Sequence, residues 1–365
     1  MDFSKRLNPK ESCQMVVKEL IESFKRENKI DEREQIFSVL PSIEGSTVLL
    51  KGFVGEQRVK NLLIQKILEN SKMNVLDQIE LLPEKKFLNM YGIVRKSVVN
   101  LVKTPETNDI VTQARMGDLL KLFKCVNDWY LVQMEDNYIG WLDSSGFVIY
   151  DEPSINSYLV NNFAVVISKF AAVEDSSMVE KIVQGTVLPY LKVSENYVWL
   201  LSPDKEQLKV RKSDVTLHSS RKEVFSVFRD AEYIINIARQ HTGLAYLWGG
   251  TTSYGFDCSG FTQFCFRMGG YFLRRDADMQ FEQGLEINSK EDMMPGDLVF
   301  FQTYKPGPSH VGIYIGNCRF IHSGSNGVTI NSFAEKDEDY SYKLDVNYIG
   351  SRRIIGAENL RHPFD

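Results

Sequence analysis

The chain has 365 residues, of which 43% are hydrophobic and 25% charged, a balance typical of ordinary globular domains. At about 150 residues per domain, this length predicts roughly two to four domains. The 43 basic and 48 acidic residues give a net charge of −5, so the chain lacks the overall basic field of a nucleic-acid-binding protein. Its five cysteines are scattered and odd in number, which does not indicate a disulfide framework.

The sequence carries no sign of membrane insertion or export. No stretch reaches the roughly 18 apolar residues that a membrane-spanning helix needs. The N-terminus, MDFSKRLNPKESCQMVVKELIESFK, is charged and interrupted, and it lacks the apolar core of a signal peptide. We therefore expect a cytoplasmic protein. The alternative is an exported protein whose leader has been removed.

The first 88 residues alternate between helix and strand patterns. Glu11–Asn28 and Glu56–Ser71 carry apolar residues at helical spacing, and Ser46–Val54 and Asn74–Leu82 have the pattern of strands. This order predicts an α-β-α-β module over residues 1–88. Because it contains one cysteine and no histidine, and no site is visible in it, we expect a docking role.

The next 130 residues, 89–218, change to short apolar runs separated by turns rich in Asn, Asp, Ser and Gly. Eight strands are predicted: Tyr91–Val99, Leu119–Cys125, Trp129–Gln133, Tyr138–Leu142, Ala164–Ser168, Val187–Val193, Tyr197–Leu201 and Gln207–Val210. The second four repeat the layout of the first four, whose GD…WYLV…GWL pattern resembles a bacterial SH3 domain. We therefore expect two small five-stranded SH3-like β-barrels, residues 89–150 and 151–218.

A third region begins at residue 219 and centres on Tyr246–Gln263, which reads YLWGGTTSYGFDCSGFTQ. Helical spacing predicts a helix over Phe225–Thr242, before this stretch. The stretch itself passes from a Gly-rich loop into a second helix, with Cys258 at or next to the helix N-terminus. There the helix dipole favours an anion, so we expect the thiol to lose its proton more easily than a free one. The unpaired N–H groups of the same helix end could bind the oxyanion of an acyl-transfer intermediate.

Two histidines follow in consecutive strand patterns. PGDLVFF predicts a buried strand, and His310 opens the next strand, HVGIYIG. After the tight turn at Gly316-Asn317, His322 lies within FIHSG. We expect both histidines on adjacent strands of one sheet that faces the helix of Cys258. A cysteine, a histidine and a third polar residue are the nucleophile, base and orienting group of covalent catalysis.

Residues 225–356 contain five motifs in a fixed order: FDCSGF, RRDA, PGDLVFF, SHVGIYIG and FIHSGS. This series resembles the NlpC-type cysteine peptidase family, which cuts bacterial cell-wall peptides. The resemblance implies a papain-like α+β catalytic domain over residues 219–365, with Cys258 as nucleophile, His310 as general base and His322 as the residue that orients His310. The predicted fold is thus multidomain α+β: an N-terminal α/β module, two SH3-like β-barrels and a C-terminal papain-like catalytic domain.

The pairing of this domain with two SH3-like domains resembles the subgroup that cleaves the γ-D-glutamyl–L-diamino-acid bond of peptidoglycan stem peptides. The resemblance implies that Tyr246 lies near the oxyanion and that Asp276 binds the substrate's free N-terminal amine. The first SH3-like domain lends the cleft an aromatic residue, for which Tyr138 is the candidate by position. Asp257 and Ser259, beside the nucleophile, complete the predicted substrate-binding residues.

The resemblance implies no metal and no organic cofactor. The expected partners are short stem peptides with a free N-terminal L-Ala, in a murein peptide recycling role. Whether lysine or diaminopimelate stands in the third position is open, as is the oligomeric state.

Other interpretations also stay open at this stage. Asp257 can simply cap the helix. Cys258, Cys265, His310 and His322 are a conceivable zinc set, although no two of them have the close spacing of a ligand pair. The same fold could serve an amidase or acyltransferase of another amide, and the SH3-like domains could make the chain a cell-wall-binding adaptor. The intact Cys–His–His set favours the peptidase.

Overall fold

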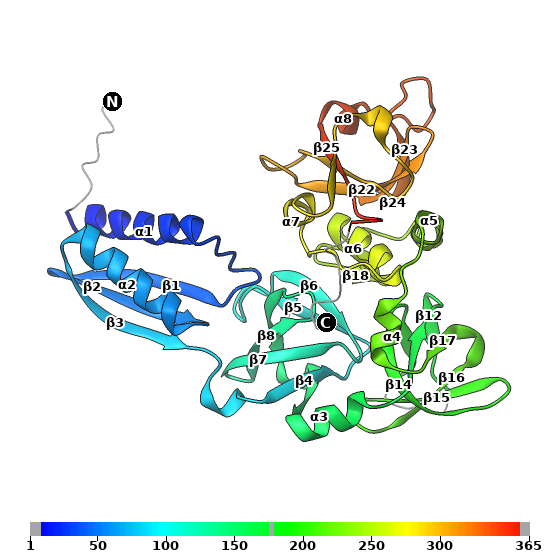
Figure 1. Cartoon of the computed structure of the whole chain (residues 1–365), viewed down its shortest axis with the longest axis horizontal. Coiled ribbons are helices and arrows are strands. Elements are labelled where there is room, and N and C mark those ends of the chain that lie inside the picture. Colours follow the sequence, from blue (N-terminus) through cyan, green and yellow to red (C-terminus); the bar gives the residue numbers. More distant parts are fainter. Residues whose placement is uncertain (1–8, 175–178, 358–365) are drawn as a thin grey trace. The chain divides into compact units, whose positions relative to one another are not determined.

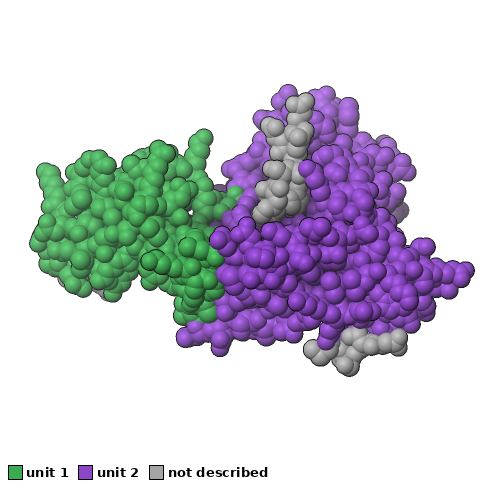
Figure 2. All heavy atoms as spheres, turned by 60° about the horizontal axis from the view of Figure 1, so that its bottom comes forward, with its two compact units in different colours: residues 1–88, 122–126 green, residues 89–121, 127–365 purple. Residues whose placement is uncertain are grey.

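The computed structural model describes residues 9–174 and 179–357 (Figure 1). The chain divides into two compact units, residues 1–88 with 122–126, and residues 89–121 with 127–365 (Figure 2). The second unit contains the first SH3-like region apart from residues 122–126, the whole second SH3-like region and the region of Cys258. None of the described helices combines the length and the hydropathy that crossing a membrane requires.

The first unit contains a three-stranded sheet with two helices. Strand β1 (Phe37–Glu44) pairs antiparallel with β2 (Thr47–Val54), and β3 (Asn74–Leu81) pairs parallel with β2. The helices α1 (Pro9–Glu27) and α2 (Gln57–Ser71) share one core with the sheet, to which they contribute Val17, Ile21, Phe24, Leu63 and Ile67. This is the expected α/β module, built on one core of its own.

The predicted order α-β-α-β is wrong, because the observed order is α1-β1-β2-α2-β3 and β1 was not predicted. Pro41 lies in the middle of β1 and has no N–H to donate to a neighbouring strand. The structure tolerates it because β1 is an edge strand of the sheet, where one side of the backbone needs no partner.

The first SH3-like region is a seven-stranded sheet in the order β10-β4-β7-β8-β9-β5-β6. Its strands are β4 (Met90–Val94), β5 (Val98–Val102), β6 (Ile110–Arg115), β7 (Leu119–Val126), β8 (Trp129–Met134), β9 (Ile139–Asp143) and β10 (Phe147–Asp151). The expectation of five strands is wrong. β4 and β5 were predicted as one strand, and β6 and β10 were not predicted.

Strand β6 escaped prediction because three of its four buried residues are polar. Thr112, Gln113 and Arg115 are at most 5% exposed. A pattern that expects apolar residues on buried positions cannot find such a strand. Thr112 and Gln113 make hydrogen bonds to the region that carries Cys258, as described below, and Arg115 donates to the backbone carbonyl of Thr251.

The second SH3-like region is a five-stranded sheet in the order β16-β15-β14-β11-β17. Its strands are β11 (Phe163–Val166), β14 (Val187–Val193), β15 (Tyr197–Leu201), β16 (Gln207–Arg211) and β17 (Val215–His218), and a hairpin of β12 (Phe170–Ala172) and β13 (Lys181–Val183) accompanies them. The helix α3 (Glu152–Leu159) precedes this region. Four of these strands match the predicted ones, whereas β12, β13 and β17 were not predicted.

The helices of the C-terminal region are α4 (Arg221–Ser226), α5 (Ala231–Gln240), α6 (Cys258–Met268), α7 (Ala277–Phe281) and α8 (Tyr342–Val346). Short 3₁₀ helices occur along the chain: η1 (Lys85–Phe87), η2 (Ser144–Gly146), η3 (Lys212–Asp214) and η4 (Lys290–Asp292). The single helix predicted over Phe225–Thr242 is wrong. Asp230 caps a new helix there, since its Oδ1 accepts a hydrogen bond from the Tyr233 N–H at 2.9 Å.

The C-terminal sheet has six strands in the order β20-β25-β21-β22-β23-β24. The strands are β20 (Leu285–Ile287), β21 (Leu298–Phe301), β22 (His310–Gly316), β23 (Arg319–Gly324), β24 (Gly327–Ser332) and β25 (Tyr348–Arg353), and β18 (Thr251–Thr252) and β19 (Gly255–Phe256) form a separate small ribbon. Helix α6 packs against β22 and β23. This layer of one helix on the sheet brings the start of α6 to the strands that carry the two histidines.

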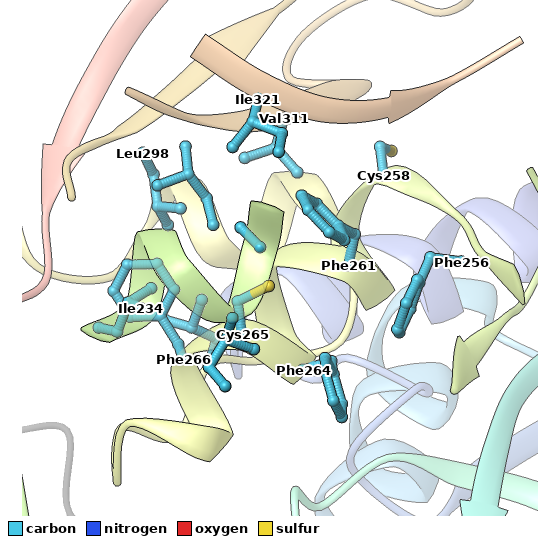
Figure 3. Close-up of a cluster of buried hydrophobic side chains, with 14 of the residues drawn as sticks. Ile234, Phe256, Cys258, Phe261, Phe264, Cys265, Phe266, Leu298, Val311 and Ile321 are labelled. Atoms are coloured by element: carbon cyan, nitrogen blue, oxygen red, sulfur yellow. The ribbon is translucent and has the colours of Figure 1, made fainter. Parts of the chain in front are cut away.

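The core between α6 and the sheet is rich in aromatic side chains (Figure 3). Phe261, Phe264 and Phe266 of α6 are at most 1% exposed, and Cys265 is fully buried among them. Cys258 stands at the first turn of the same helix, at the edge of this cluster (Figure 3). The two cysteines of α6 therefore have different surroundings, and only Cys258 borders a cavity.

Candidate active site

Cys258 is the first residue of α6, as predicted, and two elements hold its side chain. Asp257 caps the helix, with its Oδ1 accepting from the Gly260 N–H at 2.7 Å. The Cys258 sulfur accepts hydrogen bonds from the backbone N–H groups of Ser259 and Val311. Because Val311 follows His310 in β22, this contact ties the thiol to the start of the histidine strand.

The ionisation of Cys258 differs from the expectation. Burial, followed by the neighbouring Asp257 carboxylate, raises the pKa of the Cys258 thiol to about 12. The predicted easier loss of the proton is therefore wrong, because desolvation of the thiolate outweighs the helix N-terminus. Cys258 rests as a neutral thiol and needs a base at the moment of attack.

The two histidines form a hydrogen-bonded series with a residue that the sequence did not single out. His310 Nε2 lies 2.7 Å from His322 Nδ1, and both side chains are buried. His322 Nε2 lies 2.9 Å from Oδ1 of Asn331, on β24. The predicted pair is thus brought together, and Asn331 extends it by one residue.

Hydrogen-bond chemistry fixes the protons along this series. Asn331 Nδ2 donates to the backbone carbonyl of Asp339 at 3.0 Å, and a carbonyl can only accept. The Asn331 oxygen therefore faces His322, whose Nε2 must carry a proton and whose Nδ1 must accept. His310 then donates from Nε2, which leaves its Nδ1 with a free lone pair. His310 is held in the tautomer that a general base requires.

The charge state of His310 agrees with that role. Burial, followed by His322 and Lys343, lowers the pKa of His310 well below its ordinary value of 6.5. Burial also lowers the pKa of His322. At neutral pH, the His310 imidazole and the Cys258 thiol are therefore both neutral. The proton must move during the attack rather than before it.

Arg275 organises the residues beside the nucleophile and was missed as a functional residue. Its side chain is 1% exposed, and its Nη1 donates to Asp257 Oδ1 at 3.1 Å and to Ser259 Oγ at 3.0 Å. Its Nη2 lies 2.5 Å from Asp257 Oδ2, and its Nε lies 3.0 Å from the Thr112 hydroxyl of β6. Asp257 also accepts from the Gly249 N–H at 3.0 Å. Asp257 and Ser259 are thus engaged in positioning contacts, and their binding of substrate stays a prediction.

A cavity of about 260 Å³ opens over Cys258. Residues from two regions line it: Ile110, Val111, Tyr138, Tyr246, Trp248, Asp257, Cys258, Ser259, Asp276, Ala277, Asp278, Tyr304, Lys305, Pro308 and Ser309. Five predicted residues other than the nucleophile are in this set. His310 and His322 are not among these lining residues, and both are buried on β22 and β23. Tyr304 and Lys305, in the loop before His310, belong to no motif, so the sequence offered no signal for them.

Tyrosines contribute neutral hydroxyl groups to this cavity. The Tyr138 hydroxyl donates to Asp276 Oδ2 at 3.0 Å, which brings the two predicted substrate-binding residues into contact. Burial, followed by Cys258, raises the pKa of Tyr246. Burial likewise raises the pKa of Tyr304 to about 12. Tyr246 therefore keeps its proton and can donate to an oxyanion near the thiol.

The first SH3-like region is fixed to the cavity by buried polar contacts. Gln113 Oε1 accepts from the Thr251 N–H at 3.1 Å and from the Thr252 hydroxyl at 3.0 Å. Asp118 pairs with Arg267 of α6 at 2.9 Å. Because these buried polar groups pair with specific partners, they fix the position of the first SH3-like region against α6 and the Thr251–Thr252 strand.

In the part of the chain that the structure describes, no three His, Cys, Asp or Glu side chains come together as a metal site. His310 and His322 instead form a hydrogen bond between His310 Nε2 and His322 Nδ1.

Two regions of the chain match models of known protein families. Residues 243–345 match the model of the NlpC/P60 family, and residues 101–147 match that of a bacterial dipeptidyl-peptidase SH3 domain. A gamma-D-glutamyl-L-lysine dipeptidyl-peptidase of Bacillus cereus is 29% identical over 59% of this chain and 68% of its own. A protein of the same name from Bacillus subtilis is 36% identical over 49% of this chain and 60% of its own.

A crystal structure of an NlpC/P60 family protein from Bacillus cereus resembles this chain in fold. Its TM-score is 0.64, and the match covers 72% of this chain and 99% of that one at 24% sequence identity.

Proposed function

Because residues 243–345 form an NlpC/P60 cysteine peptidase domain, we propose that this chain hydrolyses the γ-D-glutamyl–L-diamino-acid bond of short peptidoglycan stem peptides. Two relatives named gamma-D-glutamyl-L-lysine dipeptidyl-peptidases support this choice of bond. The substrate in this proposal carries a free N-terminal L-Ala.

The observation that carries the proposal is the meeting of Tyr138 and Asp276 in the wall of the Cys258 cavity. Asp276 gives this wall a carboxylate, and Tyr138 orients it from the SH3-like side. A free amine is the group that such a carboxylate recognises best, as a charge-assisted hydrogen bond. The cavity thus suits a peptide whose N-terminus ends a short distance from the scissile bond.

The reaction follows from the proton positions in the site. His310 Nδ1 accepts the Cys258 proton as the sulfur attacks the γ-carbonyl carbon, and the carbonyl electron pair moves to oxygen. Backbone N–H groups at the start of α6 and the Tyr246 hydroxyl stabilise this oxyanion. When the intermediate collapses, the diamino acid leaves with the proton from His310, and a thioester remains on Cys258. Water then gives a proton to His310, attacks the thioester and releases L-Ala-γ-D-Glu, while the proton returns to sulfur.

A requirement for a free N-terminus indicates the biological role. Stem peptides that are still joined to glycan have their first residue blocked as an amide, so the proposed site would act on released peptides. This supports a role in recycling of murein peptides, and with it a cytoplasmic location.

The test is to incubate the protein with L-Ala-γ-D-Glu-L-Lys and with its diaminopimelate analogue and to weigh the products. We expect L-Ala-γ-D-Glu and the free diamino acid, with no product from Cys258→Ala. Cleavage of the L-Ala–D-Glu bond would refute the choice of bond. Binding of cell-wall fragments without any turnover would instead support an adaptor.

A further inference from the structure

The cavity over Cys258 contains one cation among its described lining residues, Lys305. Three carboxylates share that lining, and each has a different partner. Asp257 is paired with buried Arg275, and Asp276 accepts from Tyr138. Asp278 stands opposite Lys305. The cavity therefore offers an incoming substrate both a negative and a positive group.

The contact between Lys305 and Asp278 is loose. Lys305 Nζ lies 3.8 Å from Asp278 Oδ1, and the side chains are 46% and 34% exposed. A half-exposed ion pair at this distance contributes little stability, because water screens both charges. A carboxylate of the substrate can therefore take the place of Asp278 at the Lys305 ammonium.

A γ-linked glutamate carries a negative charge that the Lys305 ammonium can bind. Its γ-carboxyl group is in the scissile amide, so its α-carboxylate is free. The same α-carbon bears the nitrogen that leads to the N-terminal residue. The free carboxylate is on the glutamate α-carbon and the free amine is on the α-carbon of the preceding residue, so one peptide bond separates the two carbons. Lys305 and Asp276 line the same cavity of about 260 Å³, so one short peptide can reach both side chains.

We propose that Lys305 binds the α-carboxylate of the γ-linked glutamate and makes the enzyme selective for this residue over its α-amide, isoglutamine. The inference rests on the proposed function and adds a second charged contact to it. An uncharged α-amide loses the charge-assisted bond to Lys305 and leaves the ammonium with Asp278 only. The natural substrates are then stem peptides in which the glutamate is not amidated.

The experiment compares L-Ala-γ-D-Glu-L-Lys with L-Ala-γ-D-isoGln-L-Lys on the wild type, Lys305→Met and Lys336→Met. Lys336 is exposed and lies outside the cavity lining, so it is the matched control. The wild type and Lys336→Met should prefer the carboxylate peptide by about tenfold or more in kcat/KM. Lys305→Met should lose that preference by slowing only on the carboxylate peptide. Asp278→Asn, which removes the competing carboxylate, should lower KM for the carboxylate peptide.

Two results overturn the inference while the proposed function stands. One is equal cleavage of both peptides by the wild type, and the other is an equal loss on both peptides in Lys305→Met. If the wild type cleaves neither peptide, the proposed function fails and the inference fails with it.

Discussion

The Tyr138 hydroxyl donates a hydrogen bond to Asp276 at 3.0 Å, across 138 residues of sequence. Tyr138 belongs to the first SH3-like region, and Asp276 immediately precedes α7 of the peptidase domain. Both side chains line the cavity over Cys258. The SH3-like region is therefore part of the wall of the active site, where it orients a carboxylate that the substrate can meet.

Blocking the amine of the substrate should abolish most of the activity. Removing one partner of a charge pair that the bound substrate buries costs about 3–5 kcal/mol, so N-acetylation should lower kcat/KM by two or more orders of magnitude. Asp276→Asn should slow cleavage of the free peptide. It should therefore reduce the ratio of kcat/KM between the free and the acetylated peptide. The measurement is kcat/KM for both peptides on both enzymes.

Asp278→Asn is the control for this experiment, because Asp278 lines the same cavity without the Tyr138 contact described for Asp276. In Asp278→Asn, the ratio of kcat/KM between the free and the acetylated peptide should stay at its wild-type value. Digestion of intact sacculi as fast as free tripeptide would contradict the requirement for a free amine.

Asn331→Leu should reduce turnover through the tautomers of the two histidines. Without the Asn331 oxygen, His322 can place its proton on Nδ1 and stop accepting from His310. We expect kcat to fall by about ten- to a hundredfold with KM little changed, since the base is misoriented while the cavity is intact. Nitrogen-15 NMR of the imidazoles should show the His322 proton leaving Nε2.

The matched control is Asn326→Leu, in the exposed turn between β23 and β24. It should retain the kcat and the imidazole spectrum of the wild type. Full turnover in Asn331→Leu would contradict the assigned proton positions, as would a His322 that keeps its proton on Nε2 in this variant.

The acid limb of the pH profile should lie below pH 6.5. The pKa of His310 is lowered by burial and by His322, so His310 stays neutral and able to accept a proton as the pH falls through 6.5. Activity is lost only when the pH reaches the lowered pKa. Because His322 contributes to that lowering, His322→Gln should move the acid limb of kcat/KM upward. If the acid midpoint of kcat/KM for the wild type lies at or above pH 6.5, His310 and His322 are not the buried neutral pair described above.

His241 should make the fold less stable in acid. It is fully buried, its Nε2 lies 3.0 Å from Gln184 Oε1, and burial lowers its pKa to about 4 from 6.5. The unfolded chain therefore binds a proton near pH 6.5 that the folded chain refuses until about pH 4. From pH 7 to pH 5, this group should remove about 2 kcal/mol of the free energy of unfolding.

Urea unfolding of the wild type and His241→Leu at both pH values measures this effect. In the variant, Gln184 Oε1 loses its partner, which lowers the stability equally at both pH values. The stability of the variant should nevertheless fall less between pH 7 and pH 5. Equal falls in the two proteins would show that His241 is not the titrating group.

Local motifs explain why the catalytic set was predictable from the sequence. The helix start at Cys258 and the strands of His310 and His322 each follow from a few adjacent residues, and their order in the chain matches the family. The family and the fold class expected from the sequence are confirmed by the matches to residues 243–345 and 101–147.

Properties that depend on the folded environment were not predictable. The helix end suggested an acidic thiol at Cys258, but the structure buries it and raises its pKa. Asn331 and Lys305 stand in segments without a motif and gain their roles only from neighbours that folding brings close. β6 was hidden because Thr112, Gln113 and Arg115 are polar yet buried at a specific interface.

The most direct test of the account is kcat/KM on L-Ala-γ-D-Glu-L-Lys for the wild type, Cys258→Ala and Cys318→Ala. Cys318 is an exposed cysteine outside the cavity lining, so its loss controls for the removal of a thiol. In Cys258→Ala, kcat/KM should fall by about a thousandfold or more, because nucleophile and base act as a unit. Cys318→Ala should keep the wild-type kcat/KM. A Cys258→Ala enzyme that releases lysine at a rate near that of the wild type would contradict the account.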